Sequence, residues 1–340
     1  MELYEIEPFE YRRGPVKPAI KGYSVAADRR TLSLPYTRVS NYALTLNQLL
    51  PAADLDLDNP AVWDDTQYAT AATRAGKDFC WYLLSTGAVT LSANATAPTG
   101  HTTSDSMKLG GFHCLYVSVG VIAGHTLTGF VAGDILPASV WDLGHRPTCD
   151  PAGMVYCAEL DLWVDIYLQS GTGASTASVP GATITDTRIW NDHVDDLAAV
   201  GKILLDDTEF QIVAEGSNQK TNIAGGADPV TTGGHVDTAS RRMVSNFGLE
   251  DCCGAMFQWL RDQSYRNDDA SYLGTWSYYT IPGNKGSIYR QGGTGDIKLL
   301  AGGDWYNGAA CGSRCRSASD FRWNAATSIG SRGCARRQGV

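Results

Sequence analysis

The stretch LLAGGDWYNGAACGSRCRSASDFRWNAATSIGSRGCAR, which spans residues 299–336, sets the expectations for the whole chain. It has neither the period of two typical of a strand nor the 3.6-residue period of a helix. Glycines interrupt it, and Trp305, Tyr306, Phe321 and Trp323 lie among small and polar residues. Aromatic anchors among small adaptable residues are typical of a binding surface. We therefore expect a long ordered surface presented by a scaffold, and not a disordered tail.

Two parts of this stretch carry a family resemblance. GGDWYNGAACGSR (residues 302–314) and RWNAATSIGSRG (residues 322–333) resemble the variable region of proteins that retroelements diversify, among them the tropism determinants of phages. Other segments resemble that family in the same order: APTGHTTSDSMKLGGFH (97–113), SVWDLGHRPTCDPAGM (139–154), LWVDIYL (162–168), GKILLDDTEFQ (201–211) and GSIYRQ (286–291). The resemblance spans roughly residues 76–333.

The resemblance implies a fold, a function and a partner. The expected fold is α+β and β-rich, with a C-terminal C-type-lectin-like domain related to the formylglycine-generating enzymes. The expected function is binding, without catalysis, of a protein or other macromolecular receptor on a cell surface. The family forms homotrimers, so a homotrimer is expected here. The expected location is the virion, at a tail-fibre tip, or a cytoplasmically made prophage or viral product.

The resemblance also implies contact residues. Aligned on Gly-Gly-x-Trp, the varied positions of the family fall on alternate residues of one part of the tail. Successive side chains of an extended segment face opposite sides, so one face could vary while Trp305 and Asn307 hold the scaffold. Phe321, Arg322 and Trp323 lie among the varied positions and are suited to carry binding energy. The predicted ligand-binding residues are Asp304, Tyr306, Gly308, Ala310, Ser317, Ser319, Asp320, Phe321, Arg322, Trp323, Asn324, Ala326 and Ser328.

These positions differ in the tolerance that we expect of them. The ten varied positions, which exclude residues 321–323, are expected to point to solvent. Trp305 is expected to be buried. Gly330 is expected to be intolerant because of its backbone conformation, and Arg332 because it donates hydrogen bonds to loop carbonyls.

Composition bounds the class of protein. The chain has 340 residues, of which 43% are hydrophobic and 19% charged, with 37 glycines. These values suit two or three domains rich in strands and loops. The net charge of −9 argues against general nucleic-acid binding. Residues 302–340 instead carry six arginines and two aspartates, a net charge of +4. An acidic partner could use them, although we favour a structural role for Arg314 and Arg332.

The lack of a signal-peptide pattern and the usage of cysteine indicate a protein made in a reducing compartment. The first residues lack the basic start and apolar run of a signal peptide. No stretch has the apolar length of a membrane span, so membrane insertion is not expected. The nine cysteines are an odd number at irregular spacings, and no CxxC pair indicates a zinc site.

The chain is expected to have three parts. Residues 1–50, with several prolines, predict a strand-like segment suited to subunit contacts. Residues 51–152 predict an antiparallel β-sandwich, with strands around a turn at Thr86-Gly87 in residues 79–91 and further strands over residues 110–121 and 125–130. Residues 153–340 predict the lectin-like domain, with the variable region at about 302–333.

The lectin-like part is expected to begin with strands over residues 155–158 and 162–168, the second with an outward-facing Asp165. A helix should follow, capped by Asp186 or Thr187 and ending before Gly201. A second short helix should start at Asp207. Apolar residues of the segment 246–260 are predicted to lie in the core: Leu249, Met256, Phe257 and Trp259.

Two patterns resemble calcium sites, and neither is complete. Asp54, Asp56 and Asp58 match the start of an EF-hand loop, but Asn59 and Asp65 replace its Gly and Glu, so a solvated acidic turn is favoured. Trp190-Asn191-Asp192 spells a triplet of C-type lectins, but it lies in a helix pattern. The histidines of the sandwich are interpreted as ordinary strand or turn residues: His101, His113, His125 and His145. We therefore expect neither a metal nor a cofactor.

The alternative to a binding protein is a formylglycine-generating-enzyme-like, cysteine-dependent oxidase. Those enzymes use two cysteines in the equivalent glycine-rich tail, and Cys311 and Cys315 lie there. Aligned on the glycine pair, however, the enzyme's cysteines would fall near Asn307 and Gly312. Arg314 and Arg316 could lower the pKa of Cys315, as a reactive thiol requires. The departure at the catalytic positions favours ordinary cysteines.

Overall fold

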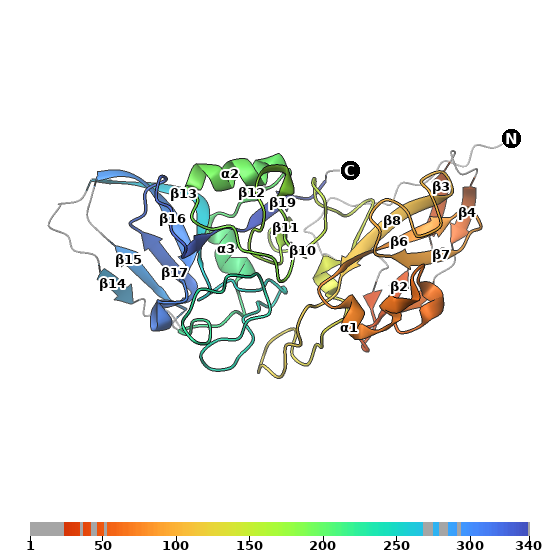
Figure 1. Ribbon diagram of the computed structural model, residues 1–340, viewed down its shortest axis with the longest axis horizontal. Helices are drawn as coiled ribbons and strands as arrows, with labels where there is room; N and C mark the ends of the chain where they lie inside the picture. The colour runs from red at the N-terminus through yellow and green to blue at the C-terminus, as the bar shows by residue number, and fades with distance from the viewer. Residues whose placement is uncertain are drawn as a thin grey trace.

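The structure is a computed structural model that describes residues 24–34, 37–41, 46–50, 53–267, 275–278, 285–290 and 294–338. Most of the segment expected over residues 1–50 lies outside these ranges. The described chain is elongated, with the strands nearest the N-terminus at one end and β14, β15 and β17 at the other (Figure 1).

Two antiparallel sheets form the N-terminal end. One has the order β1-β2-β5 and the other the order β7-β6-β8-β9, while β3 and β4 pair as a separate hairpin. Their bounds are β1 Ser24–Val25, β2 Thr31–Leu34, β3 Thr37–Asn41, β4 Leu46–Leu50, β5 Ala53–Asp56, β6 Asp78–Leu84, β7 Val89–Ser92, β8 Ser106–His113 and β9 Trp141–Asp142. The hairpin predicted around Gly87 is confirmed, and Gly87 has the positive φ of 86° that its turn needs.

Both sheets share one hydrophobic core, as a sandwich requires. Leu32 and Leu55 from the smaller sheet pack in the same buried cluster as Phe79, Trp81 and Phe112 from the larger sheet. Strands β2 and β5, on either side of residue 50, pair with each other. The division of the chain at that residue stays a prediction.

The strands predicted over residues 110–121 and 125–130 are largely wrong. β8 ends at His113, and the chain then runs in turns as far as residue 134. Gly120, Gly124 and Gly129 adopt positive φ values of 75°, 72° and 74°, which a strand does not allow. The apolar residues of this loop are still buried, because Leu115, Val119 and Leu127 join a core cluster.

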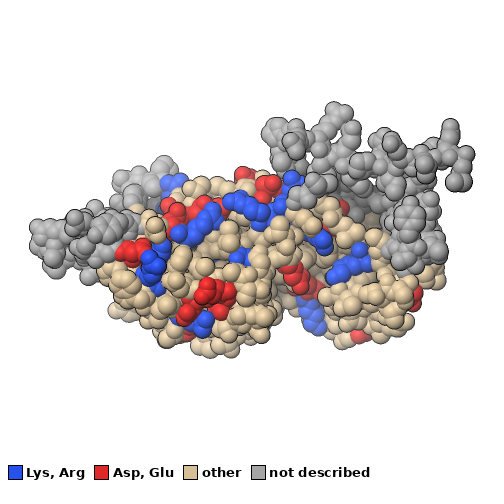
Figure 2. Space-filling view, turned by 90° about the horizontal axis from the view of Figure 1, so that it is seen from above, with Lys and Arg blue, Asp and Glu red and all other residues tan. Residues whose placement is uncertain are grey.

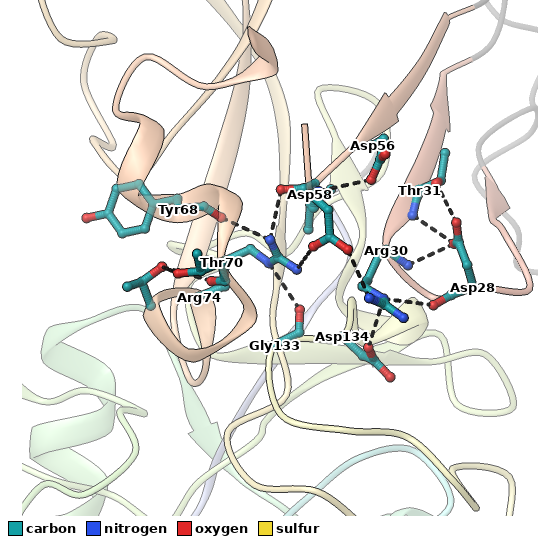
Figure 3. A network of polar contacts seen from close by, with 12 residues as sticks. Asp28, Arg30, Thr31, Asp56, Asp58, Tyr68, Thr70, Arg74, Gly133 and Asp134 are labelled. Atoms are coloured by element: carbon teal, nitrogen blue, oxygen red, sulfur yellow. Dashed lines mark hydrogen bonds and ion pairs between the residues drawn. The ribbon is translucent and has the colours of Figure 1, made fainter. Parts of the chain in front are cut away.

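A buried arginine joins the pieces of the N-terminal end (Figure 3). Arg74, in the short helix α1 (Ala71–Arg74), is fully buried. Its guanidinium donates to the carbonyl oxygens of Leu57 at 2.8 Å and Tyr68 at 3.0 Å, and pairs with Asp58 at 2.7 Å. Arg30 pairs with the same carboxylate at 2.9 Å. Both carboxylate oxygens of Asp58, which the sequence placed in an EF-hand-like pattern, are therefore paired with arginine side chains.

The ion pairs of Asp58 predict how stability depends on pH. Burial alone would raise the pKa of Asp58, but hydrogen bonds and charge from Arg74 and Arg30 lower it below its ordinary value of 3.8. A carboxylate with a lowered folded-state pKa stabilises the fold above its unfolded pKa, and this contribution is lost as pH falls through the folded value. We expect the free energy of unfolding to fall more steeply below about pH 4 in the wild type than in Asp58→Asn.

Urea denaturation at neutral pH and at several acidic pH values measures this difference. A matched control is Asp54→Asn, because the Asp54 carboxylate accepts a hydrogen bond from the Ser33 hydroxyl and has no arginine partner among the described residues. Identical pH profiles for the wild type and Asp58→Asn would contradict the role of the network.

The C-terminal end is built on two further sheets, in the orders β10-β11-β19-β12 and β14-β15-β17-β16-β13-β18. The strand bounds are β10 Met154–Cys157, β11 Leu162–Asp165, β12 Ile203–Leu204, β13 Phe257–Asn267, β14 Thr275–Tyr278, β15 Ser287–Arg290, β16 Thr294–Gly302, β17 Gly312–Ala318, β18 Ile329–Gly330 and β19 Gly333–Arg336. The helices α2 (Trp190–Ala199) and α3 (Asp207–Val213) pack beside them (Figure 1). The chain is β-rich with few helices, as predicted.

The two predicted helices exist, but the N-terminus of the first differs from the expectation. α3 begins at Asp207, as predicted, with a capping box between Asp206 and Glu209. α2 begins at Trp190 and has no side-chain cap, so the predicted caps are wrong. The backbone N–H of Trp190 instead donates to the Arg322 carbonyl oxygen at 2.9 Å. A carbonyl oxygen distant in sequence thus accepts a backbone N–H that a capping side chain would otherwise accept.

The core of this end matches the prediction except at one carboxylate. Leu249, Met256, Phe257 and Trp259 are all buried. Asp165, predicted to face outward, is buried as well and pairs with Lys202 at 2.6 Å. The outward direction is wrong because β19 and β12 extend the sheet beyond β11, and Lys202 comes from the approach to β12.

Candidate binding surface

The two ends of the stretch 302–333 lie on either side of one core segment, residues 255–258, which leads into β13. On one side Asp304 pairs with Ala255 as an isolated parallel bridge. On the other side β18 pairs in parallel with β13, with Ile329 opposite Phe257. Residues far apart in the tail are therefore fixed to the same short stretch of backbone.

The glycine pair before the first half is required by close packing. Gly302 and Gly303 have φ values of 90° and 83°. A Cβ at Gly302 would lie 2.3 Å from the Cys252 carbonyl oxygen, and one at Gly303 would lie 2.7 Å from the Cys311 sulfur. Any other residue would combine a strained backbone with a clash.

The first half, residues 303–310, forms a tight turn. Asp304 is buried, burial raises its pKa, and its Oδ1 accepts the backbone N–H of Tyr306 at 2.9 Å and the side-chain amide of Asn307. Trp305 is half-buried and packs on Met256 and Met243. The turn leaves Tyr306 87% exposed. One aromatic side chain thus holds the turn while the next one faces solvent.

The second half, residues 317–328, is fixed by a polar cluster and a turn. The carboxylate of Asp320 accepts from Ser317 at 2.6 Å, Ser319 at 3.1 Å and Asn324 at 3.2 Å. The following turn stacks Phe321 on Trp323, with ring centroids 4.8 Å apart and planes 3° apart. Trp323 remains 59% exposed.

The predicted contact residues differ in exposure. Tyr306, Arg322 and Trp323 are exposed. Half-buried are Gly308, Ser319, Asp320, Phe321, Asn324, Ala326 and Ser328. The expectation that all ten varied positions point to solvent is wrong for Asp304, Ala310 and Ser317, which are buried.

The reason is local backbone geometry. Strict alternation holds for an extended segment, but the chain turns at Asp304 and forms a 3-10 helix at Gly308–Ala310. The structure also exposes three positions outside the predicted set, Ala309, Ala325 and Thr327. No sequence signal separates these small residues from their buried neighbours.

The closing motif 329–333 is structural, but not through Gly330. Arg332 is buried and donates to the carbonyl oxygens of Asp165 and Ile166 at 2.8 and 2.5 Å, as predicted for its role. Gly330 has no positive φ, and a Cβ there would meet only ordinary contacts, so its predicted intolerance is wrong. Gly333 is the constrained glycine, since a Cβ would lie 2.5 Å from Asp165 Oδ2.

Most arginines of the tail form ion pairs or hydrogen bonds with other residues of the chain. Four of the six are ion-paired, Arg316 with Asp207, Arg322 with Asp296, Arg336 with Glu209 and Arg337 with Asp161. Arg332 is buried, and Arg314 lines a shallow hollow. On the face shown in Figure 2, basic and acidic side chains lie next to each other. This pattern gives no support to an acidic partner.

The cysteines of the tail lie in an unreactive environment. Cys311 and Cys315 are both buried. Burial raises the pKa of Cys311 far above its ordinary value and that of Cys315 to about 12. Arg316 does act against this shift at Cys315, as the sequence suggested, but burial dominates. The thiolate that oxidase chemistry needs is therefore scarce.

Alkylation tests the state of these thiols. We expect iodoacetamide at neutral pH to leave Cys311 and Cys315 unmodified in the folded chain and to modify both in denaturant, as read by peptide mass spectrometry. The half-buried Cys80 and Cys149 serve as internal controls for partial access. Rapid labelling of Cys315 in the folded chain would revive the oxidase alternative.

Metal and membrane sites receive no support from the described residues. Within those ranges, no three His, Cys, Asp or Glu side chains are arranged to hold a metal ion. His113 is engaged by Asp78 Oδ1 at 3.1 Å and the Tyr167 hydroxyl at 3.0 Å, a contact between the two ends of the molecule. No helix in the described ranges could cross a bilayer.

Comparisons with known proteins agree with this architecture. Residues 55–142 match the family described as Mtd second domain. The chain is 28% identical over 275 residues to the tail fiber receptor-binding protein of Bordetella phage BPP-1. The aligned region covers 74% of this chain and 68% of that protein.

Solved structures extend the match to almost the whole chain. The Major Tropism Determinant P3c variant aligns with a TM-score of 0.70 and 25% identity over 93% of this chain and 83% of that one. The M1 variant aligns with a TM-score of 0.69 and 25% identity over 94% and 84%. In sequence and in fold, this chain is similar to the phage major tropism determinants and shares their β-rich architecture.

Proposed function

We propose that this chain is a phage receptor-recognition protein, carried at the tip of a tail fibre, whose surface on residues 302–333 binds a molecule on the host cell. The similarity to a tail fiber receptor-binding protein supports the class. The observation that carries the assignment to this surface is the pair of exposed aromatic residues, Tyr306 and Trp323. The turn before Tyr306 is fixed at Ala255, and the turn of Trp323 is fixed by Trp190 and Lys298.

The contacts that we propose follow the exposure of the side chains. Tyr306, Arg322 and Trp323 are the exposed members of the predicted set, and seven others are half-buried. Asp304, Ala310 and Ser317 would act indirectly, by shaping the turns on which the others stand. The cysteine-dependent oxidase is not favoured, because the thiols of Cys311 and Cys315 are buried.

We also propose that a retroelement diversifies this surface. The turns that carry it contribute few residues to the core, so their outer side chains can change while Gly302, Gly303 and Arg332 stay. Sequencing the flanking DNA tests this proposal. A near-copy of the codons for residues 299–333, differing chiefly at adenines and next to a reverse transcriptase gene, is expected; its absence would contradict diversification.

The homotrimer remains part of the proposal. Three copies on one fibre would raise the avidity for a repetitive target on a cell surface. Light scattering should then give three times the chain mass of 36.5 kDa. A monomer mass at micromolar concentration would contradict it.

Receptor recognition itself is tested with fluorescently labelled protein and a panel of intact bacteria. The wild type should label some strains, and the variant Tyr306→Ala/Trp323→Ala should lose that labelling while keeping its melting temperature. Equal labelling by both proteins would contradict the assigned surface.

A further inference from the structure

We infer that the stacked Phe321–Trp323 pair is the energetic anchor of this surface, and that it takes a flat, uncharged side chain of the receptor, such as a prolyl ring or an apolar or aromatic group. This inference rests on the proposed function and adds to it the residue that dominates affinity and the chemistry of its partner.

The first argument is rigidity. The backbone N–H of Asn324 donates to the Phe321 carbonyl oxygen at 2.9 Å and closes the turn that stacks the two rings. The Arg322 carbonyl oxygen between them accepts from Trp190, the first residue of α2, and the Asp320 carbonyl oxygen accepts from Lys298 in β16, each at 2.9 Å. Because the indole is held before the receptor arrives, little side-chain entropy is left to lose on binding.

The support below the turn is also fixed. Lys298 Nζ lies 4.2 Å from the centroid of the Trp190 ring, and the Trp190 indole N–H donates to the Leu260 carbonyl oxygen at 2.8 Å. The platform therefore stands on a helix and a central strand of the largest sheet, and not on a free loop.

The second argument is charge. The Asp320 carboxylate next to the pair already accepts three side-chain hydrogen bonds, from Ser317, Ser319 and Asn324. The Arg322 guanidinium is ion-paired with Asp296. The groups around the indole therefore leave no unpaired charge to be matched by a charged ligand. A sugar would need the same oxygen acceptors for its hydroxyl groups, so an apolar side chain fits this surface better.

The third argument is position. The ten positions that the resemblance marks as varied skip residues 321–323. Tyr306, on the other half of the surface, is one of the ten. A rigid aromatic pair outside the expected varied positions would supply affinity to every variant, while its neighbours select the partner.

Two libraries of the full-length chain test the inference without the natural receptor. Both randomise Tyr306, Gly308, Ser319, Asn324, Ala326 and Ser328; one keeps Trp323 and the other carries Trp323→Ala. Each is selected against hen lysozyme, an unglycosylated folded protein, and separately against dextran, a neutral polysaccharide. A third library with Val121→Ala is the matched control, because Val121 is an apolar side chain that is 93% exposed and lies outside the surface.

We expect lysozyme binders from the Trp323 and Val121→Ala libraries, and binders about 10- to 100-fold weaker from the Trp323→Ala library. In single binders, Trp323→Ala should weaken binding by the same factor, and Trp323→Phe should restore most of the loss. The melting temperature should stay unchanged in each. Alanine scanning of lysozyme should place the coupled partner at an apolar or aromatic side chain.

The failures are distinguishable. Equal affinities from the Trp323 and Trp323→Ala libraries would overturn the anchor and leave the adaptable surface standing. Coupling to a charged lysozyme residue, or Trp323-dependent binders to dextran alone, would overturn the assigned chemistry. No binders from any library would contradict the proposed function itself.

Discussion

Replacing Arg332 by Ala is expected to lower the free energy of unfolding by about 3–5 kcal/mol. The side chain is buried and joins β11 to the segment before β13, through the carbonyl oxygens of Asp165, Ile166 and Glu250 and the side chain of Gln258. Its loss removes a donor from each of these buried acceptors, of which the Ile166 carbonyl oxygen keeps the backbone N–H of Glu250. Each buried group left unsatisfied costs about 1–3 kcal/mol. Urea denaturation at a fixed protein concentration measures the change.

Arg314 provides the matched control for Arg332. It belongs to the same tail and was expected from the sequence to be structural too, but it is half-buried at the edge of a hollow. Arg314→Ala should change stability by no more than about 0.5 kcal/mol. Similar losses in the two variants would show that Arg332 does not hold the tail in the way described.

Replacing Lys202 by Met should cost about 3–5 kcal/mol, because it leaves the buried Asp165 carboxylate without its cation. The ion pair is 2.6 Å long, and both side chains are at least nine-tenths buried. Asp165 Oδ2 also accepts the backbone N–H of Gly333 at 3.1 Å, so the change reaches the closing motif of the tail. Chemical denaturation again gives the magnitude.

The control for Lys202 is Arg336→Met, which removes an ion pair with Glu209 from a side chain that is 56% exposed. Exposed pairs contribute about 0–1 kcal/mol. The loss of stability should therefore be clearly larger for Lys202→Met than for Arg336→Met. A cost below about 1 kcal/mol for Lys202→Met would mean that the Asp165 site admits water or relaxes.

Local sequence signals predicted the elements that local interactions determine. The hairpin around Gly87 and the start of α3 at Asp207 follow from turn and capping residues within a few positions. The apolar side chains of Leu249, Met256, Phe257 and Trp259 are buried, as their hydrophobicity predicted. The structural role expected of Arg332 is confirmed by its hydrogen bonds to the carbonyl oxygens of Asp165 and Ile166.

The features that the sequence did not predict depend on contacts between residues that are distant in sequence. α2 begins at Trp190 because Arg322 accepts its N–H, a pairing across 132 residues that no capping pattern reveals. Asp165 is buried and pairs with Lys202, which lies just before β12 and 37 residues away in sequence. Alternation failed at Asp304 and Ala310 because the chain turns and forms a 3-10 helix there. Ser317, which the family resemblance marked, is buried in β17.

The most direct test of the central claim is a deep substitution scan of residues 302–333, read by protease resistance of the displayed full-length chain. The account predicts that Tyr306, Ala309, Arg322, Trp323, Ala325 and Thr327 accept most substitutions, within about 0.5 kcal/mol. Gly302, Gly303 and Arg332 should accept almost none. If Tyr306 and Trp323 prove as intolerant as Gly302, the outer side chains hold the fold, and the surface is not one that displays residues to a receptor.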